Sequence, residues 1–314
     1  MARALIAVLG LALALVSLPN LAAPPPAHTL LLDLAVVGER LVAVGERGRI
    51  LYSDDQGASW QAAQVPTRQM LTAVYFVDGQ HGWAVGHDAQ ILYSADAGAT
   101  WARQYEDRQR EAPLLDVWFQ DAHHGLAVGA YGALLETHDG GAHWQDVSER
   151  LDNPEQLHLN GLAEVKDAGL VLVGEQGSLF RSRDAGRSWV AVASPYAGSL
   201  FGVIATGRPR TLLVYGLQGN LWRSDDFGDR WQPVRVEGSA TASLAGATRL
   251  AAGSLVVVGN AGTLLRSDDD GVHFTAVQRS DRRALAAVVG LPAGGLALAG
   301  EGGVQVTAGQ ASPP

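Results

Sequence analysis

Short apolar runs bounded by glycine turns recur along the chain at a nearly fixed interval. Seven runs each open a unit, and they span residues 30–37, 71–77, 114–120, 159–165, 200–206, 244–250 and 285–291. In every unit a second apolar run ends on a pair such as Val85 and Gly86, and a two-residue tip follows. Apolar runs of this length are typical of buried strands, and a glycine-flanked tip is typical of a β-hairpin. The pattern predicts repeated antiparallel β-modules.

A polar motif, Ser/Thr-x-Asp-x-Gly-x-x-Trp, follows the third strand of six units, and its copies start 41 to 45 residues apart. Its acidic members are Asp55, Asp96, Asp139, Asp184, Asp226 and Asp269, and its indoles are Trp60, Trp101, Trp144, Trp189 and Trp231, with Phe274 in the sixth copy. Aspartate accepts hydrogen bonds from nearby backbone N–H groups, glycine permits positive φ, and the indole can fold back over the turn. We interpret this Asp box as a hairpin staple; a ligand or metal contact is the alternative.

Four strands in each of seven units predict an all-β fold, a seven-bladed β-propeller of four-stranded antiparallel blades with Asp-box turns. We expect one propeller domain over residues 24–310 and a short tail at 311–314. The seventh unit contains only three strand signals before the chain ends. We therefore expect residues 24–30 to supply its outer strand, and a three-stranded last blade is the alternative.

The first residues of the chain predict export. Arg3 precedes an apolar run over residues 4–18, and Pro19 and the small residues Ala22 and Ala23 follow. This is the layout of a secretory signal peptide, and the run is short for a membrane-spanning helix. We expect a signal peptide at residues 1–23 and an exported mature protein without a membrane span, in the periplasm, or in the thylakoid lumen if the organism is photosynthetic. An uncleaved anchor is the alternative.

Composition and charge narrow the function. The net charge is −9, which disfavours nucleic acid as a partner, and the chain contains no cysteine, so its stability must come from packing. The motif aspartates stand one per blade, too far apart to act as paired glycosidase carboxylates. Neither a nucleophile motif nor a phosphate loop is found. His81 and His124 precede equivalent strands, and we interpret them as turn residues. We expect no enzyme activity, no cofactor and no metal.

Arginines gather in loops that the alternating strand direction places on one face. These loops carry Arg68, Arg108, Arg110, Arg150, Arg279, Arg282 and Arg283. Guanidinium groups suit carboxylates and phosphates, so we predict a partner-binding surface; a solvated rim paired with acidic neighbours such as Glu106 and Asp281 is the alternative. A second set, Arg181, Arg223 and Arg266, precedes the motif serine in three consecutive units. We predict that it forms a further partner-binding stripe; a stripe without a function is the alternative.

The repeats HGWAVG…ILYSADAGATW and HHGLAVG…LLETHDGGAHW resemble those of the photosystem II stability and assembly factor family, exported seven-bladed propellers of the Asp-box type. The resemblance spans about residues 30–307. It implies a non-enzymatic factor on the luminal or periplasmic side that holds a client membrane complex with an arginine-rich face. The residues that could match such a face are Arg68, Arg108, Arg110, Arg282 and Arg283. In bacteria without a photosystem, the client of a similar protein would be another membrane assembly.

Two other functions stay open. Sialidases share the Asp box, so a glycan-binding or sialidase-like protein is one alternative; such an enzyme would need three arginines that converge near the axis, a Tyr/Glu pair and a further acid. An accessory module of an envelope transporter is the other. We expect a monomer whose partner is a membrane protein complex or its assembly intermediate.

Overall fold

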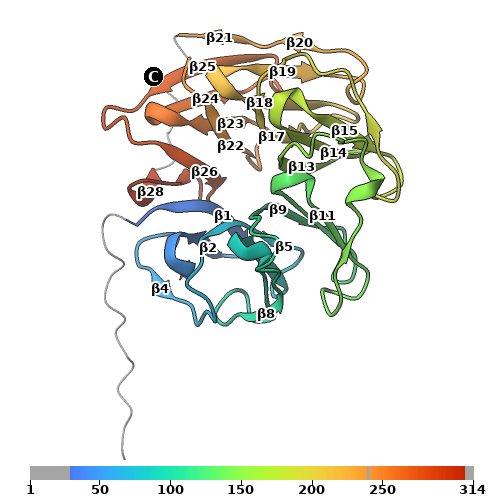
Figure 1. Cartoon of the computed structure of the whole chain (residues 1–314). Coiled ribbons are helices and arrows are strands. Elements are labelled where there is room, and N and C mark those ends of the chain that lie inside the picture. The colour runs from blue at the N-terminus through green and yellow to red at the C-terminus, as the bar shows by residue number, and fades with distance from the viewer. Residues whose placement is uncertain (1–28, 239–240, 308–314) are drawn as a thin grey trace, which may run out of the picture.

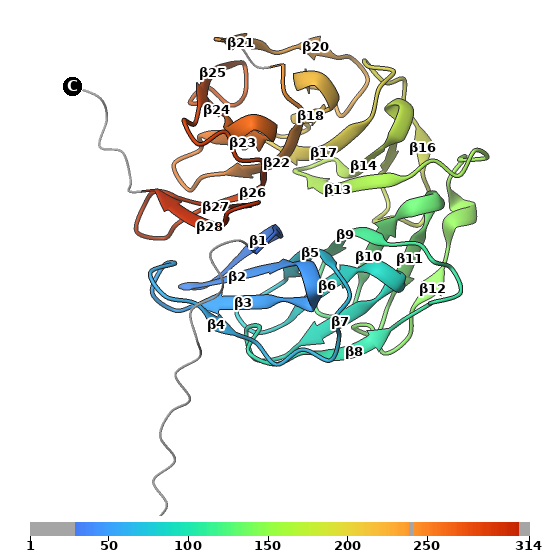
Figure 2. The same cartoon turned by 60° about the vertical axis from the view of Figure 1, so that its left-hand side comes forward.

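The computed structural model describes residues 29–238 and 241–307. Their strands form seven sheets around a central axis, which confirms the predicted seven-bladed all-β propeller (Figures 1 and 2). The ring is closed, because the first strand, β1 (Leu31–Val37), contacts β26 (Leu285–Gly290) of the last blade. No helix in the described part is both long and apolar enough to cross a membrane. The expected signal peptide at residues 1–23 and the tail at 311–314 lie outside the described residues.

Each blade starts beside the axis and ends at the rim. The first three blades contain β1, β2 (Arg40–Gly45), β3 (Ile50–Ser53) and β4 (Gln61–Ala62), then β5 (Leu71–Phe76), β6 (Gly82–Gly86), β7 (Ile91–Ser94) and β8 (Ala102–Tyr105), then β9 (Leu114–Phe119), β10 (Gly125–Gly129), β11 (Leu134–Thr137) and β12 (Gln145–Asp146). The fourth and fifth contain β13 (Leu159–Val165), β14 (Gly169–Gly174), β15 (Leu179–Ser182) and β16 (Val190–Ala191), then β17 (Leu200–Ala205), β18 (Leu212–Gly216), β19 (Leu221–Ser224) and β20 (Gln232–Pro233).

The last two blades depart from the four-stranded pattern. The sixth contains β22 (Leu244–Arg249), β23 (Leu255–Gly259), β24 (Thr263–Ser267) and β25 (His273–Gln278), and the seventh contains β26, β27 (Leu296–Gly300) and β28 (Gly303–Thr307). β21 (Arg235–Glu237) adds a fifth strand to the sixth blade by pairing parallel with β25. The described part of the seventh blade is three-stranded, and residues 24–28 of the segment expected to complete it lie outside the described residues.

Short 3-10 turns form the tips that join the second and third strands. They are η1 (Glu46–Gly48), η2 (His87–Ala89), η3 (Ala130–Gly132), η5 (Glu175–Gly177), η6 (Leu217–Gly219) and η7 (Asn260–Gly262); η4 (Ser148–Arg150) lies instead after β12. Within these tips the middle residue has a positive φ, for example 58° at Arg47 and 55° at Tyr131. The chain therefore reverses over very few residues, as the predicted two-residue tips require.

Each Asp-box turn is held by the same pattern of hydrogen bonds. In the second blade the Ser94 hydroxyl donates to Asp96 Oδ1 (2.9 Å), and the Gly98 N–H donates to Ser94 Oγ (2.9 Å). The Trp101 indole folds back and donates from Nε1 to the Gly98 carbonyl (2.9 Å). The hydroxyl–carboxylate and glycine–hydroxyl bonds recur in all six copies. Such bonds favour the ionised acid; those from Ser59 and Ser53 lower the pKa of Asp55 to about 2.

The hydrophobic core is divided into seven clusters, and each cluster lies between two adjacent blades. Between the first and second blades, for example, Val42 and Ile50 pack against Leu92 and Trp101. Between the second and third, the Trp83 and Phe119 rings stack with their centroids 3.4 Å apart. The seventh cluster joins the last blade to the first through residues such as Leu41 and Ala299. No blade buries its apolar faces alone, so the ring is the unit that is stabilised.

Hydrogen bonds from side chains tie the innermost strands of the first five blades together. Asp33 Oδ2 accepts from the Val74 N–H (2.8 Å), and Thr72 Oγ1 donates to the Leu114 carbonyl (2.6 Å). The next two ties repeat the alternation: Asp116 Oδ2 accepts from the Leu162 N–H (2.8 Å), and Asn160 Nδ2 donates to the Leu200 carbonyl (2.8 Å).

Small residues replace these ties in the later blades. Gly202, Gly246 and Ala287 occupy the place of Asp33, and a Cβ atom added at Gly246 would collide with the Ala286 carbonyl of the next blade. Close backbone packing therefore joins the innermost strands of the sixth and seventh blades, and it also occurs at Gly161 in the fourth blade.

The two axial aspartates have raised pKa values. Burial raises the pKa of Asp33 to about 7, with a smaller contribution from the charge of Asp116, and burial raises the pKa of Asp116 to about 6. Backbone N–H donors oppose this effect in both cases. Both groups open onto the narrow axial channel, where their residues are half-buried. They retain protons at pH values where an exposed aspartate is ionised.

Trp101→Ala is expected to lower the free energy of unfolding by about 3–5 kcal/mol, because it empties a large site in the cluster between the first two blades. The indole residue is only 7% exposed. Urea unfolding followed by fluorescence of the remaining tryptophans measures the change. Asp152→Ala, at an exposed position, is the control and should leave stability within about 0.5 kcal/mol of the original. Equal losses in the two variants would show that the core does not lie where we place it.

The axial aspartates should make stability fall as pH rises from about 4 to 7. In this window the native carboxyls hold protons that the unfolded chain has released, so the native state binds more protons and loses stability with increasing pH. Urea unfolding at several pH values compares the original chain with an Asp33→Asn, Asp116→Asn double variant, in which this decline should be smaller. Asp152→Asn should keep the original slope. Parallel pH profiles for the original chain and the double variant would contradict the assignment.

Candidate docking face

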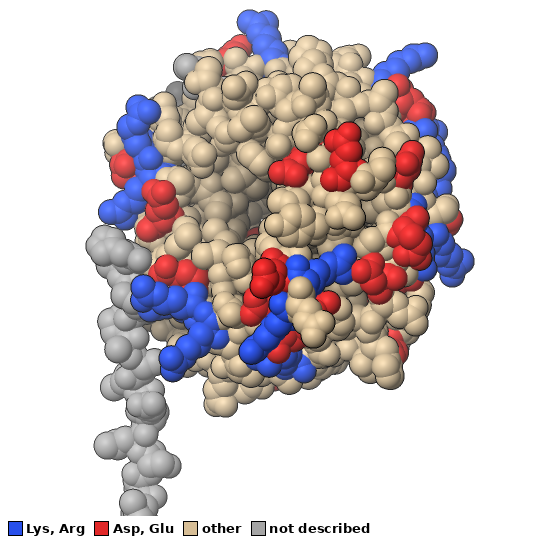
Figure 3. Space-filling model, viewed as in Figure 1, with Lys and Arg blue, Asp and Glu red and all other residues tan. Residues whose placement is uncertain are grey.

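The tips and the loops between blades lie on the same side of the ring. The Glu46 N–H donates to the Leu30 carbonyl (3.0 Å), and the His87 N–H donates to the Met70 carbonyl (3.0 Å). The corresponding bond, from the residue after the second strand to the residue before the first, is present in all seven blades. We call this side, made of the 3-10 turns and the blade-to-blade loops, the loop face. In Figure 3, basic and acidic groups are interspersed around the hollow centre of the ring.

The predicted loop arginines fall into two groups. Arg68, Arg282 and Arg283 are exposed, and their side chains form no ion pair with another described residue. Arg108 is also exposed and contacts Glu106 (3.1 Å). Other loop arginines are paired internally: Arg110 with Asp146 (2.6 Å), Arg150 with Glu136 (2.9 Å) and Arg279 with Asp281 (3.1 Å). Among the predicted loop arginines, Arg68, Arg282 and Arg283 therefore present guanidinium groups without an ion pair to a described residue.

Two arginines that the sequence analysis did not single out join Arg68 in a pocket. Arg47 and Arg49 come from the η1 tip, which packs against the loop after β4, and the pocket has a volume of about 360 Å³. Trp60 and Val65 supply apolar walls. We call these five residues the basic pocket. The two arginines of the Glu46-Arg47-Gly48-Arg49 segment are visible in the sequence, but only the fold shows that this segment lies beside the loop that carries Arg68.

A second hollow, of about 610 Å³, lies beside the η3 tip in the third blade. Arg110, Glu149 and Asp152 line it, so its charges are mixed. Tyr131 stands at its edge with 55% of its surface exposed and contacts the His158 ring edge-on, with centroids 5.1 Å apart. This hollow offers an aromatic surface but lacks the uniform positive charge of the basic pocket.

The predicted arginine stripe is engaged inside the molecule. Arg181 donates to the Phe227 carbonyl (2.9 Å) and to Asp229 (2.6 Å), both in the Asp-box turn of the next blade. Arg223 is bonded in the same way to the Asp270 carbonyl, and its side chain is only 7% exposed. Arg266 pairs with Asp268 in its own blade (3.0 Å).

Two further arginines make the same contact with the following blade. Arg40 donates to the Ala97 carbonyl (3.2 Å), and Arg150 donates to the Gly186 carbonyl (3.2 Å). Together with Arg181 and Arg223, they tie neighbouring blades together outside the axis.

The axial channel contains a cavity of about 250 Å³ lined by the innermost strands. Asp33, Asp116 and Tyr215 supply polar groups to it, and burial, with smaller contributions from the two aspartates, raises the pKa of the Tyr215 hydroxyl. Each aspartate carboxylate already accepts two backbone N–H groups, from Leu34 and Val74 in the case of Asp33. Their bonds therefore serve the ring, and the loop face remains the better candidate for binding a partner.

Several solved propellers have a similar fold. "YCF48 bound to D1 peptide" superimposes with a TM-score of 0.69 at 18% identity, over 92% of this chain and 94% of that one. "YCF48 from Cyanidioschyzon merolae" gives a TM-score of 0.69 at 16% identity, over 90% and 96% of the two chains. A streptogramin B lyase gives 0.75 at 12% identity, over 92% and 96%. These likenesses show the fold, which binding proteins and enzymes share.

The family is shown by the sequence itself. A search of curated proteins finds no match. The family model described as "Photosynthesis system II assembly factor YCF48", however, matches residues 52–114 and 107–308, which is most of the chain. The match confirms the resemblance noted from the repeats. The chain belongs to the photosynthesis system II assembly factor YCF48 family.

Proposed function

We propose that the chain is a non-catalytic, exported assembly factor that holds an acidic, extended segment of a membrane-protein client in the basic pocket. The observation that carries the proposal is the convergence of Arg47, Arg49 and Arg68 beside the Trp60 indole on a chain whose net charge is −9. Family membership and the YCF48 that was solved with a D1 peptide support a peptide-binding role. The predicted signal peptide supports a periplasmic or luminal location.

The pocket suits a carboxylate-bearing peptide for physical reasons. Guanidinium groups bind carboxylates through paired, charge-assisted hydrogen bonds, and an indole beside them offers a surface for the peptide's carbon atoms. The protein's overall negative charge repels an acidic segment elsewhere, so attraction is concentrated at arginines that no acidic side chain neutralises. Arg49 donates to the Thr29 hydroxyl (2.9 Å), which leaves its charge uncompensated. The exposed Arg108, Arg282 and Arg283 extend positive charge along the loop face beyond the pocket.

Binding is favoured over glycoside hydrolysis by the residues that line the basic pocket. They include three arginines, but these lie beside the outer strand β4 rather than near the axis, and the lining contains no tyrosine and no carboxylic acid. A sialidase-like site requires both of these beside the arginines. The pocket can therefore hold an acid but lacks the tyrosine and the carboxylic acids that a sialidase uses for cleavage.

An Arg47→Glu, Arg68→Glu double variant should bind an acidic peptide at least tenfold more weakly, since each lost charge-assisted bond is worth about 1.5–3 kcal/mol. The probe is a fluorescent synthetic peptide of alternating Glu and Ala with a free C-terminal carboxylate, followed by polarisation at low and high salt. Its Gln-for-Glu, amidated counterpart should bind weakly to the original chain. The melting temperature should not fall, because both side chains are at the surface.

Arg230→Glu is the matched control, because it makes the same charge change at an exposed position in an Asp-box turn, away from the loop face. Its affinity should equal that of the original chain. Unchanged affinity in the double variant would reject the basic pocket as the docking site. Failure of the original chain to prefer the acidic peptide would reject the proposed ligand class.

A further inference from the structure

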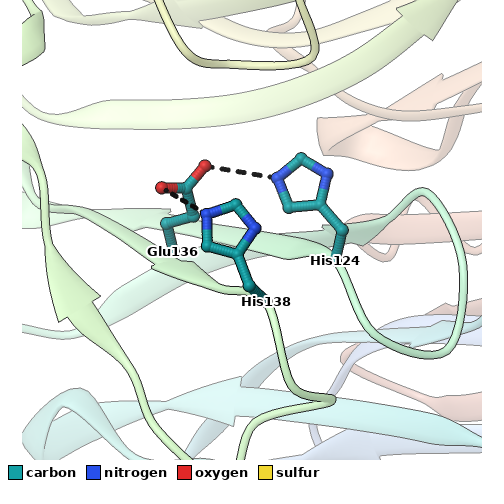
Figure 4. Close-up of side chains that lie close together, drawn as sticks. All are labelled: His124, Glu136 and His138. Atoms are coloured by element: carbon teal, nitrogen blue, oxygen red, sulfur yellow. Dashed lines mark hydrogen bonds and ion pairs between the residues drawn. The ribbon is translucent and has the colours of Figure 1, made fainter.

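Two histidines and a glutamate meet in the third blade, away from the basic pocket. His124 precedes β10, Glu136 lies in β11, and His138 lies in the Asp-box turn that follows β11. His124 Nε2 is 3.2 Å from Glu136 Oε1, and His138 Nε2 is 3.2 Å from Glu136 Oε2. Figure 4 shows both imidazole rings directed at the carboxylate. One candidate ligand atom from each residue can be chosen so that all three lie within 4.8 Å of one another.

The repeat does not require this arrangement. The place of Glu136 is taken by Tyr52 and Tyr93 in the first two blades, and by an arginine in the fourth, fifth and sixth blades. In the second blade, His81 stacks on Tyr93 with centroids 6.2 Å apart and contacts Asp78 of its own turn, so a histidine at this turn needs no carboxylate at the place of Glu136. Glu136 is nevertheless almost completely buried, with its side chain 2% exposed. Burying a carboxylate is costly unless it is compensated, so its presence needs a reason beyond the blade fold.

Glu136 is paired with a guanidinium group in spite of its burial. Arg150 Nη2 contacts Oε2 (2.9 Å). The other oxygen, Oε1, therefore faces His124 as an anionic acceptor.

Both ring nitrogens of His124 face side-chain oxygens. Its Nδ1 is 3.2 Å from Gln120 Oε1, while its Nε2 is 3.2 Å from Glu136 Oε1. A neutral imidazole carries a single N–H, so in this orientation of Gln120 one nitrogen points a lone pair at an oxygen. If Nδ1–H donates to Gln120, the Nε2 lone pair is free for a cation between it and the carboxylate. An N–H bonded to a second-shell oxygen is the usual support of a metal-binding histidine.

We propose that His124, Glu136 and His138 bind a divalent transition-metal ion of the Zn²⁺ type, with water at the fourth position. Zinc prefers imidazole and carboxylate ligands at about 2.0–2.2 Å, which places tetrahedral ligand atoms roughly 3.3 Å apart. The distance between His124 Nε2 and Glu136 Oε1, 3.2 Å, matches this spacing, whereas His138 Nε2 now faces the other oxygen, Oε2, and must turn toward the ion. His138 is 61% exposed, so the ion can enter from solvent and the ring can turn toward it. The ion joins the turn before β10, the strand β11 and the Asp-box turn, and so staples the outer half of the blade.

Arg150 gives the proposal a distinctive consequence. Its positive charge contacts a ligand carboxylate and opposes a second cation there, although its bond to Oε2 leaves Oε1 for the metal. Removing that charge should tighten metal binding. If the three side chains only formed hydrogen bonds with one another, the protein would bind no metal, and removing the Arg150 charge would have no metal affinity to change.

The test uses the mature chain, freed of metal with a chelator and titrated with Zn²⁺ by calorimetry and with Co²⁺ by visible absorption. We expect one ion per chain, a tetrahedral Co²⁺ spectrum and a higher melting temperature with Zn²⁺. Glu136→Gln and His138→Gln should each weaken binding at least tenfold, whereas Arg150→Gln should strengthen it. Melting curves without metal verify that each variant is folded; His138→Gln, at an exposed position, keeps the test decisive if a buried variant fails.

His143→Gln is the matched control. His143 lies in the same Asp-box turn, is 85% exposed, and contacts Asp139 (2.7 Å) rather than Glu136. Its loss should leave the affinity and the Co²⁺ spectrum unchanged. The proposal is overturned if the original chain takes up no ion, if His138→Gln binds as tightly as the original chain, or if His143→Gln abolishes uptake.

Discussion

Packing between adjacent blades is the constraint on which the whole molecule depends. The chain has no disulfide, and each of its seven apolar clusters draws residues from two neighbouring blades. Bonds such as the one from the Val74 N–H to Asp33 hold the innermost strands together, and the contact between β1 and β26 closes the circle. Because a closed ring has no terminal blade, every loop is held by two neighbours, which gives the loop face a fixed shape.

Most of this architecture could be predicted from the sequence because it repeats. The Asp-box period and the seven apolar runs gave the number of blades, and β9 ends only one residue before the predicted run does. β21 could not be predicted, since it has no counterpart in the other units and pairs parallel to β25. The Phe274 copy marked that blade as unusual, but nothing in its residues indicates a fifth strand.

The candidate sites were harder to predict because they depend on register and on neighbours from other blades. Arg181 and Arg68 were both predicted to bind a partner, yet one reaches the Asp-box turn of the next blade and the other lies exposed in a pocket. The pair His124 and His138 does follow from register, because Gly125 and Thr137 are partners across the hairpin. The bond from Arg150 to Glu136 does not, because Arg150 comes from the loop after β12.

Glu136 links two parts of the third blade that the topology otherwise separates. One of its oxygens accepts from Arg150, whose η4 turn helps to line the hollow beside Tyr131, and the other faces His124 on the Asp-box side. A carboxylate shared between two cations holds each less strongly than it would hold either alone. The proposed metal ion on the Asp-box side and the guanidinium from the loop face would therefore oppose each other, and by linkage the effect would be reciprocal. Arg150 also bonds the Gly186 carbonyl, so this competition reaches the contact with the fourth blade.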